Sequence, residues 1–167
     1  YALASPENDV TLTDLAEFSD VFYIGGTKCG ALFGEAVVIP QKGRIPHFFT
    51  IIKQHGALLA KGRIAGIQFG ELFTDGLYQR IGKPAMEAAE QIKAALKKYG
   101  YQLSLDTPTN QIFCIVSNDV MKEIAQDVEF GFWEKYDETH SVIRFATSWA
   151  TTMEDTQKLI QILEKNK

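Results

Sequence analysis

Two short apolar runs near the start of the chain have the composition of strands. The first covers residues 21–24 and ends at a pair of glycines, and the second covers residues 35–39 and ends at Pro40. β-Branched and aromatic residues bounded by glycine or proline are typical of strands. The pattern therefore predicts two strands joined by a glycine-rich turn, which carries Lys28.

Between residues 46 and 100 the apolar spacing becomes that of helices. The clearest segment is 86–99, an amphipathic helix with lysines in its last turn and Gly100 directly after it. Glycine after such a turn is typical of a helix end. The other apolar residues with helical spacing are Phe48, Ile51, Ile52, Leu58, Leu59, Ile64, Phe69 and Leu72.

After residue 100 strands and helices alternate, which predicts a compact α+β module. At the start of the chain we expect a loop at 1–10 and a short helix at 11–18, capped by Thr11 or Thr13. The expected strands are 103–105, 111–117, 132–136 and 141–147. The expected helices are one capped by Asn118 or Asp119 that runs to about 130, and one at 152–164.

Composition and charge narrow the classes of function. The 167 residues include 46% hydrophobic and 23% charged residues, as in an ordinary globular domain. The net charge of −4 argues against a nucleic-acid partner. No apolar run has the length of a membrane span, and no secretory signal opens the chain. Two cysteines do not make a disulfide framework, so we expect a cytoplasmic location.

The stretch GGTKCG at 25–30 is the most informative chemically. It is neither a Walker A loop nor a dinucleotide fingerprint, because its spacing differs and a strand follows instead of a helix. Lys28 is either a solvated turn lysine or a Schiff-base lysine, whose neutral amine would attack an aldehyde. Cys29 is either a small core residue or a reactive thiol. The three histidines have no metal-ligand spacing, so no metal site is expected.

Three segments in the same order resemble a known family. They are DVFYIGGTK at 20–28, FFTIIKQHGALLAKGRIAGIQF at 48–69 and SVIRFATSW at 141–149. Together they resemble the lysine segment and later parts of the fold-type I pyridoxal-phosphate (PLP) enzymes, most closely the threonine aldolase branch of the β-eliminating lyase family. One departure is that Cys-Gly-Ala-Leu-Phe-Gly follows Lys28, where the family often has Gly-Leu-Gly-Ala-Pro.

The resemblance implies an α/β fold of the PLP-transferase type. Residues 1–83 would be the C-terminal part of the large cofactor-binding domain, 84–100 a connecting helix, and 101–167 a small α+β C-terminal domain. The resemblance implies that Lys28 binds the cofactor covalently and that Thr27 contacts its phosphate. It also implies that Arg144 binds the substrate carboxylate in the same active site as Lys28. Lys53 and Lys61 would reach the active site across a subunit interface, which implies a homodimer or homotetramer.

The implied reaction is cleavage of the Cα–Cβ bond of a β-hydroxy-α-amino acid of the threonine type, giving glycine and an aldehyde. The alternatives are a β-eliminating lyase or aminotransferase of the same fold, and a non-catalytic homologue. In the family, an aspartate on the pyridine nitrogen, a ring-stacking residue and a phosphate-binding helix N-terminus precede the segment that begins here. We therefore expect the chain to be an incomplete portion, inactive alone, whose missing half lies upstream or on a second chain.

Overall fold

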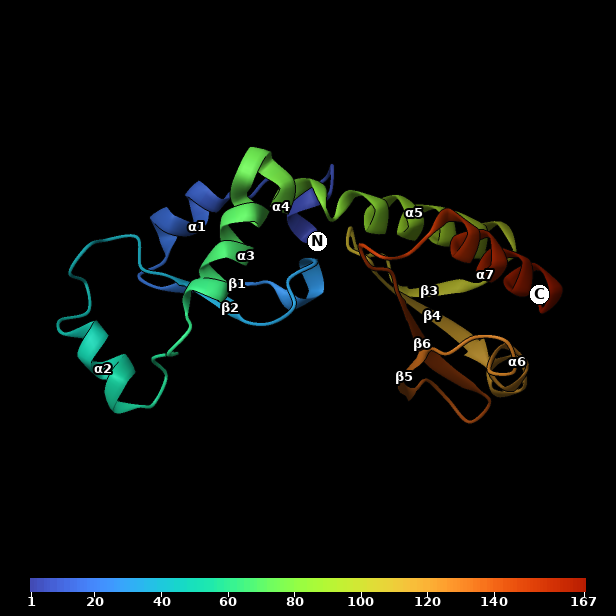
Figure 1. The fold of residues 1–167 in the computed structure, drawn as a ribbon. Coiled ribbons are helices and arrows are strands. Elements are labelled where there is room, and N and C mark those ends of the chain that lie inside the picture. The colour runs from blue at the N-terminus through green and yellow to red at the C-terminus, as the bar shows by residue number, and fades with distance from the viewer. The chain divides into compact units, whose positions relative to one another are not determined.

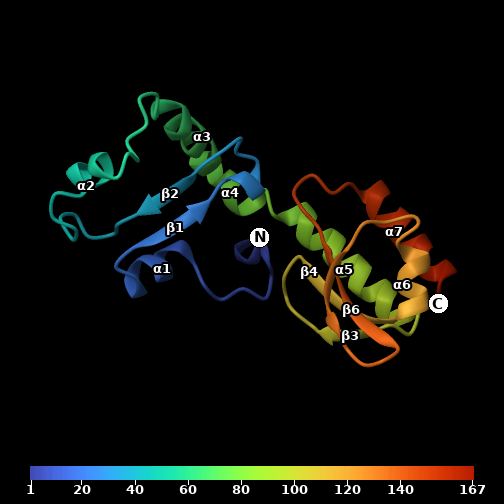
Figure 2. The same ribbon diagram turned by 90° about the horizontal axis from the view of Figure 1, so that it is seen from below.

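The computed structural model describes residues 1–167, and the chain divides into two compact units. One unit is 9–80, and the other combines 1–8 with 81–167 (Figures 1 and 2). Each unit is described here by itself. No helix is both long enough and apolar enough to span a membrane. The domain limits expected for a complete enzyme, at 83 and 100, stay a prediction.

The unit 9–80 is built on an antiparallel strand pair, as the sequence predicts. β1 (Phe22–Gly25) pairs with β2 (Glu35–Val38). Before them lies α1 (Leu12–Phe18), whose N-cap is Thr11: its hydroxyl accepts the backbone N–H of Asp14, and the Asp14 carboxylate accepts that of Thr11. This reciprocal capping satisfies two backbone donors at the helix start. The prediction of Thr11 as a cap is confirmed.

Short helices follow the strand pair. They are α2 (Phe48–Gln54), α3 (Arg63–Phe73), the 3₁₀ turn η3 (Thr74–Gly76) and α4 (Leu77–Arg80). The expectation that the helical pattern continues through Leu58 and Leu59 is wrong. The N–H of Gly56, which has a φ of 67°, bonds to the carbonyl of Lys53, and the N–H of Ala57 bonds to that of Ile52. These two bonds form a Schellman motif that ends α2, so both leucines lie exposed in a connecting segment.

The second unit contains the predicted long helix, α5 (Lys83–Lys98). It begins three residues before the predicted start at 86, with a proline in its first turn, where the missing N–H costs nothing. At its end the N–H of Tyr101 bonds to the carbonyl of Leu96, and Gly100 has a φ of 85°. This is a second Schellman motif, and it confirms Gly100 as the residue after the helix. In the segment 1–10, expected as loop, the turn η1 (Ala2–Ala4) is 3₁₀-helical.

The sheet of this unit has four strands, all antiparallel, in the order β3-β4-β6-β5. The small antiparallel α+β module is therefore confirmed. The strands are β3 (Gln102–Leu105), β4 (Gln111–Ser117), β5 (Gly131–Lys135) and β6 (His140–Ala146). Two helices complete the unit, α6 (Asn118–Ile124) and α7 (Met153–Lys165).

Helix α6 differs from its prediction at both ends. Its cap is Ser117, whose hydroxyl accepts the N–H of Val120, rather than Asn118 or Asp119. It ends at Ile124, six residues short of the expected end at 130. The chain then turns back, and Phe130 packs edge-on against Phe145 with ring centres 6.2 Å apart. Contact with the core, rather than helix propagation, decides the path of this segment.

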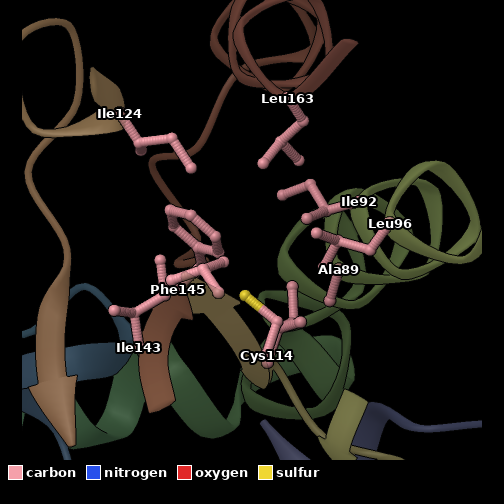
Figure 3. Close-up of a cluster of buried hydrophobic side chains, with 10 residues drawn as sticks. Ala89, Ile92, Leu96, Cys114, Ile124, Ile143, Phe145 and Leu163 are labelled. Atoms are coloured by element: carbon pink, nitrogen blue, oxygen red, sulfur yellow. The ribbon is translucent and has the colours of Figure 1, made fainter. Parts of the chain in front are cut away.

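The hydrophobic core lies between one face of the sheet and the helices. Figure 3 shows side chains from α5, α6 and α7 converging on strands β4 and β6. The core residues are Ala89, Ile92, Leu96, Ile112, Cys114, Val116, Ile124, Ile143, Phe145 and Leu163. The helices pack on this face, and the opposite face carries Phe113 and Arg144 beside the buried pair Ile115 and Val142.

Candidate functional site

Lys28 lies on the turn between β1 and β2, as predicted. The turn η2 (Thr27–Cys29) is 3₁₀-helical, and the carbonyl of Gly26 accepts the N–H groups of Cys29 at 2.8 Å and Ala31 at 3.0 Å. Lys28 and Thr27 are exposed, whereas Cys29 is buried. The turn therefore presents an amine and a hydroxyl side by side, and it packs the thiol inside. For Cys29 this geometry favours the core role over the reactive one.

Gly26 is the position of this turn where a side chain does not fit. A Cβ atom there would lie 2.8 Å from the ring of Phe69, 2.9 Å from Cβ of Ala31 and 3.0 Å from the carbonyl oxygen of Gly34. Real Cβ atoms do not approach other atoms this closely. At the neighbouring Gly25, by contrast, a Cβ would meet nothing within 4 Å. The close approach of α3 to the lysine turn thus depends on Gly26.

Side chains of α3 and α4 also bind the backbone on either side of Lys28. The Oε1 atom of Gln68 accepts the N–H of Leu32 at 2.6 Å, after the lysine. The hydroxyl of Tyr78 donates to the carbonyl of Gly25 at 2.9 Å, before the lysine. The tyrosine is itself stacked on Phe73, with ring centres 5.1 Å apart. The turn is therefore held at both ends by helices that follow it in the sequence.

Arg144 lies on the face of the second unit's sheet that the helices leave uncovered. Its neighbours Ile143 and Phe145 are in the core, and successive side chains of a strand point to opposite faces. The backbone of Arg144 pairs with Phe113 of β4 on one side and Gly131 of β5 on the other. The side chain is half-buried. Alternation alone did not assign a role to this arginine, but the sheet shows which face carries it.

The contacts of the Arg144 guanidinium are with neutral groups. Nη1 donates to Oε1 of Gln111 at 3.2 Å, and the guanidinium carbon lies 5.6 Å from the centre of the Trp133 ring. Trp133 in turn meets Phe113 edge-on, at 4.9 Å between ring centres. None of the chain's ion pairs includes Arg144. Its charge is therefore uncompensated by a carboxylate of its own unit, as a carboxylate-binding arginine requires.

The other predicted site residues are less informative. Lys53 is in the last turn of α2 and Lys61 is in the segment before α3, and both are exposed. Their role across a subunit interface stays a prediction. Lys28 and Arg144 lie in different compact units, and their sharing of one active site also stays a prediction.

Several residues that hold these side chains were not singled out from the sequence. Gln68 and Tyr78 bind the lysine turn from positions 40 and 50 residues later, and no local motif marks such contacts. Gln111 and Trp133 come to Arg144 from the two flanking strands. Strand pairing places Phe113 and Gly131 opposite Arg144, whereas Gln111 lies two residues away on β4 and Trp133 lies at an irregularity of β5 that regular pairing does not predict.

One further groove, of about 620 Å³, lies in the second unit between α7 and β6. Core side chains such as Phe145 and Leu159 form its walls, and an ion pair between Lys165 and Asp127, at 3.8 Å, lies at its edge. None of the predicted site residues lines this groove. The candidate chemistry therefore lies outside it.

Comparisons with solved structures identify the fold. A threonine aldolase from Leishmania major is 37% identical, covers 98% of this chain and superposes with a TM-score of 0.92. The chain spans about half of that enzyme, 48% of its length. Serine palmitoyltransferases from Sphingomonas wittichii and S. paucimobilis, the second solved with a bound PLP–myriocin aldimine, are 11% identical with TM-scores of 0.55 and 0.52, which shows likeness of fold alone. No family model and no curated protein matched. The resemblance to the threonine aldolase branch is thereby confirmed, and the chain has the fold of the corresponding part of a fold-type I PLP enzyme.

Proposed function

We propose that this chain contributes the cofactor lysine and the carboxylate-binding arginine of a PLP-dependent lyase. The lyase would cleave the Cα–Cβ bond of a β-hydroxy-α-amino acid of the threonine type, releasing glycine and an aldehyde. The observation that carries the proposal is the likeness to the Leishmania major threonine aldolase over nearly the whole chain. The contacts of Lys28 and Arg144 support it independently.

The lysine turn has the donors that PLP needs. Lys28 presents a primary amine, the group that forms a covalent bond with the cofactor's aldehyde. Thr27 presents a hydroxyl that can donate a hydrogen bond to a phosphate. PLP, when bound, supplies an electron sink for the pair of electrons left at Cα. Because Gln68 and Tyr78 hold the backbone on both sides, the amine is on a fixed turn rather than a mobile loop.

Arg144 would bind the α-carboxylate of the substrate. A guanidinium matches a carboxylate with two parallel hydrogen bonds, which fix orientation as well as position. Orientation matters because the bond that breaks must lie perpendicular to the cofactor ring. Only one contact of the guanidinium is a hydrogen bond to its own unit, through Nη1 to Gln111, so other donors remain available.

The assembly, substrate and location of this chain are part of the same proposal. We propose that it acts as at least a homodimer, in which Lys53 and Lys61 of one subunit approach the site of the other. A small amino acid is the proposed substrate, and the cytoplasm the proposed location.

A panel of amino acids tests the proposed reaction. The complete enzyme, in which this chain is combined with the missing half, is incubated with PLP and with threonine, allo-threonine or serine, with and without a keto acid, and the products are quantified. We expect acetaldehyde and glycine from threonine or allo-threonine. Pyruvate and ammonia would instead identify a β-eliminating lyase, and dependence on the keto acid would identify an aminotransferase. No turnover of any amino acid by a protein that binds PLP would favour a non-catalytic homologue.

A further inference from the structure

The guanidinium of Arg144 is held from both neighbouring strands. β6 lies between β4 and β5, and each flanking strand supplies one partner: Gln111 accepts a hydrogen bond at 3.2 Å, and Trp133 contributes its ring at 5.6 Å. Opposite the arginine on β5 is Gly131, where a Cβ would lie 3.4 Å from Nε and 3.5 Å from Nη2. A Cβ at this position would be in ordinary van der Waals contact with the guanidinium, so the backbone of β5 passes directly beside the arginine.

Each of these two partners is itself fixed. The backbone of Gln111 is bound on both sides by hydroxyls: its carbonyl accepts from Thr107 at 3.0 Å, and its N–H donates to Thr109 at 3.3 Å. The ring of Trp133 packs edge-on against Phe113, with an angle of 70° between the ring planes. The backbone of Gln111 and the ring of Trp133 are therefore held before a ligand binds.

An irregularity in β5 accounts for the position of Trp133. Phe132 pairs with Ile143 and Glu134 pairs with Val142, so Trp133 is left as an extra residue between two regular pairs. Such bulges turn a side chain toward a direction that regular pairing does not give. The tryptophan is 52% exposed, so its ring remains accessible beside the guanidinium.

We propose that Gln111 and Trp133 are positioning residues that hold Arg144 ready for the substrate carboxylate. This inference rests on the proposed function of Arg144 as the carboxylate anchor. An arginine side chain has many rotamers, and restricting them before binding lowers the entropic cost of binding. An aromatic ring against a guanidinium and one hydrogen bond at Nη1 restrict rotation while the charge stays uncompensated.

Tryptophan fluorescence of the complete enzyme tests the proposal, with the emission of Trp133 taken as the difference between the parent and Trp133→Phe. Trp149→Phe is a second variant that removes the other tryptophan of this chain, whose described contact is through its backbone N–H. The probe is glycine, titrated into the protein with PLP, and glycinamide is the control without a carboxylate. We expect glycine, but not glycinamide, to change the emission of Trp133, because a carboxylate neutralises the charge beside the ring.

Variants of the two partners complete the test. We expect Gln111→Ala and Trp133→Ala each to weaken glycine binding about two- to fivefold, with KM raised more than kcat is lowered, and Trp133→Phe to restore most of the loss. For variants of Trp133, glycine binding is measured by the change in absorbance of the bound cofactor instead of by fluorescence. Circular dichroism identifies any variant that does not fold. If Trp133→Ala and Gln111→Ala bind glycine as tightly as the parent while Arg144→Ala does not bind it, the positioning role is wrong and the proposed function stands. If Arg144→Ala binds glycine normally, the proposed role of the arginine itself is wrong.

Discussion

Arg144 packs against Trp133, with its guanidinium carbon 5.6 Å from the centre of the ring, and it takes part in no ion pair. An arginine on a solvated strand surface is commonly paired with acidic side chains or extended into water. This one is half-buried against an aromatic ring and an amide. The arrangement keeps a positive charge in a fixed place without neutralising it, which is the requirement for binding a small carboxylate.

The first prediction concerns the planar guanidinium group that carries the charge of Arg144. Arg144→Lys keeps the charge but loses the fork of donors, and one lost hydrogen bond to a charged partner is worth about 1.5–3 kcal/mol. We expect kcat/KM for the amino acid substrate to fall about tenfold to a hundredfold. Steady-state kinetics of the active protein measures the effect. An unchanged kcat/KM would remove Arg144 from the site.

The second prediction concerns the packing of the lysine turn. Gly26→Ala places a methyl group 2.8 Å from the ring of Phe69 and 3.0 Å from the carbonyl oxygen of Gly34, which is backbone and cannot rotate away. We expect a loss of about 1–3 kcal/mol in the free energy of unfolding, the usual cost of overpacking. Urea denaturation measures it.

Gly25→Ala is the matched control for this substitution. It lies one residue earlier in the same turn, and its Cβ would meet nothing within 4 Å. We expect the control to unfold within about 0.5 kcal/mol of the parent, as for an exposed substitution. Equal destabilisation by both alanines would show that backbone freedom, and not the contact with Phe69, makes glycine necessary at position 26.

The third prediction is a pH dependence at the turn between β5 and β6. The backbone N–H of Thr139 donates to Asp137 at 2.7 Å, and with further hydrogen bonds, including one from His140 at 2.8 Å, it lowers the pKa of this carboxyl to about 2. Because the pKa of Asp137 in the folded protein lies below the unfolded value of 3.8, the ionised carboxylate stabilises the folded state fully at pH values above 3.8. This stabilisation is then lost as the pH falls from 3.8 toward about 2.

We therefore expect Asp137→Ala to lower the urea midpoint at pH 7, and the difference from the parent to shrink between pH 4 and pH 2. Glu134→Ala is the control, since it removes an exposed carboxylate from the neighbouring strand. A difference at Asp137 that does not vary with pH would mean that the loss is one of turn geometry and not of the ionised carboxylate.

The sequence predicted most elements where a local signal is strong. β4 has the predicted bounds 111–117, and Thr11 and Thr152 both cap their helices with a reciprocal bond from an aspartate. The errors lie where distant contacts decide. Val128 follows Ile124 at helical spacing, yet Val128 and Phe130 pack against the core from the irregular segment after the turn that ends α6.

The same distinction holds for the candidate site. The flanking glycines between two strands singled out Lys28 as a local feature, and the resemblance of three ordered segments implied its cofactor role. The partners Gln68 and Tyr78 could not, because their contacts depend on how two later helices pack on the turn. The bulge that brings Trp133 to Arg144 also has no glycine or proline at 133 to mark it.

The most direct test of the account is the identity of the lysine that holds the cofactor. The complete enzyme that contains this chain is incubated with PLP, reduced with borohydride and digested, and the modified peptide is sequenced by mass spectrometry, with Lys42→Ala, at an exposed residue, as the control variant. The account predicts an absorbance band at about 410–430 nm before reduction and a phosphopyridoxyl group on Lys28 after it, both retained in Lys42→Ala and lost in Lys28→Ala. A band that persists in Lys28→Ala, or a modification found on another lysine in the parent protein, would contradict it.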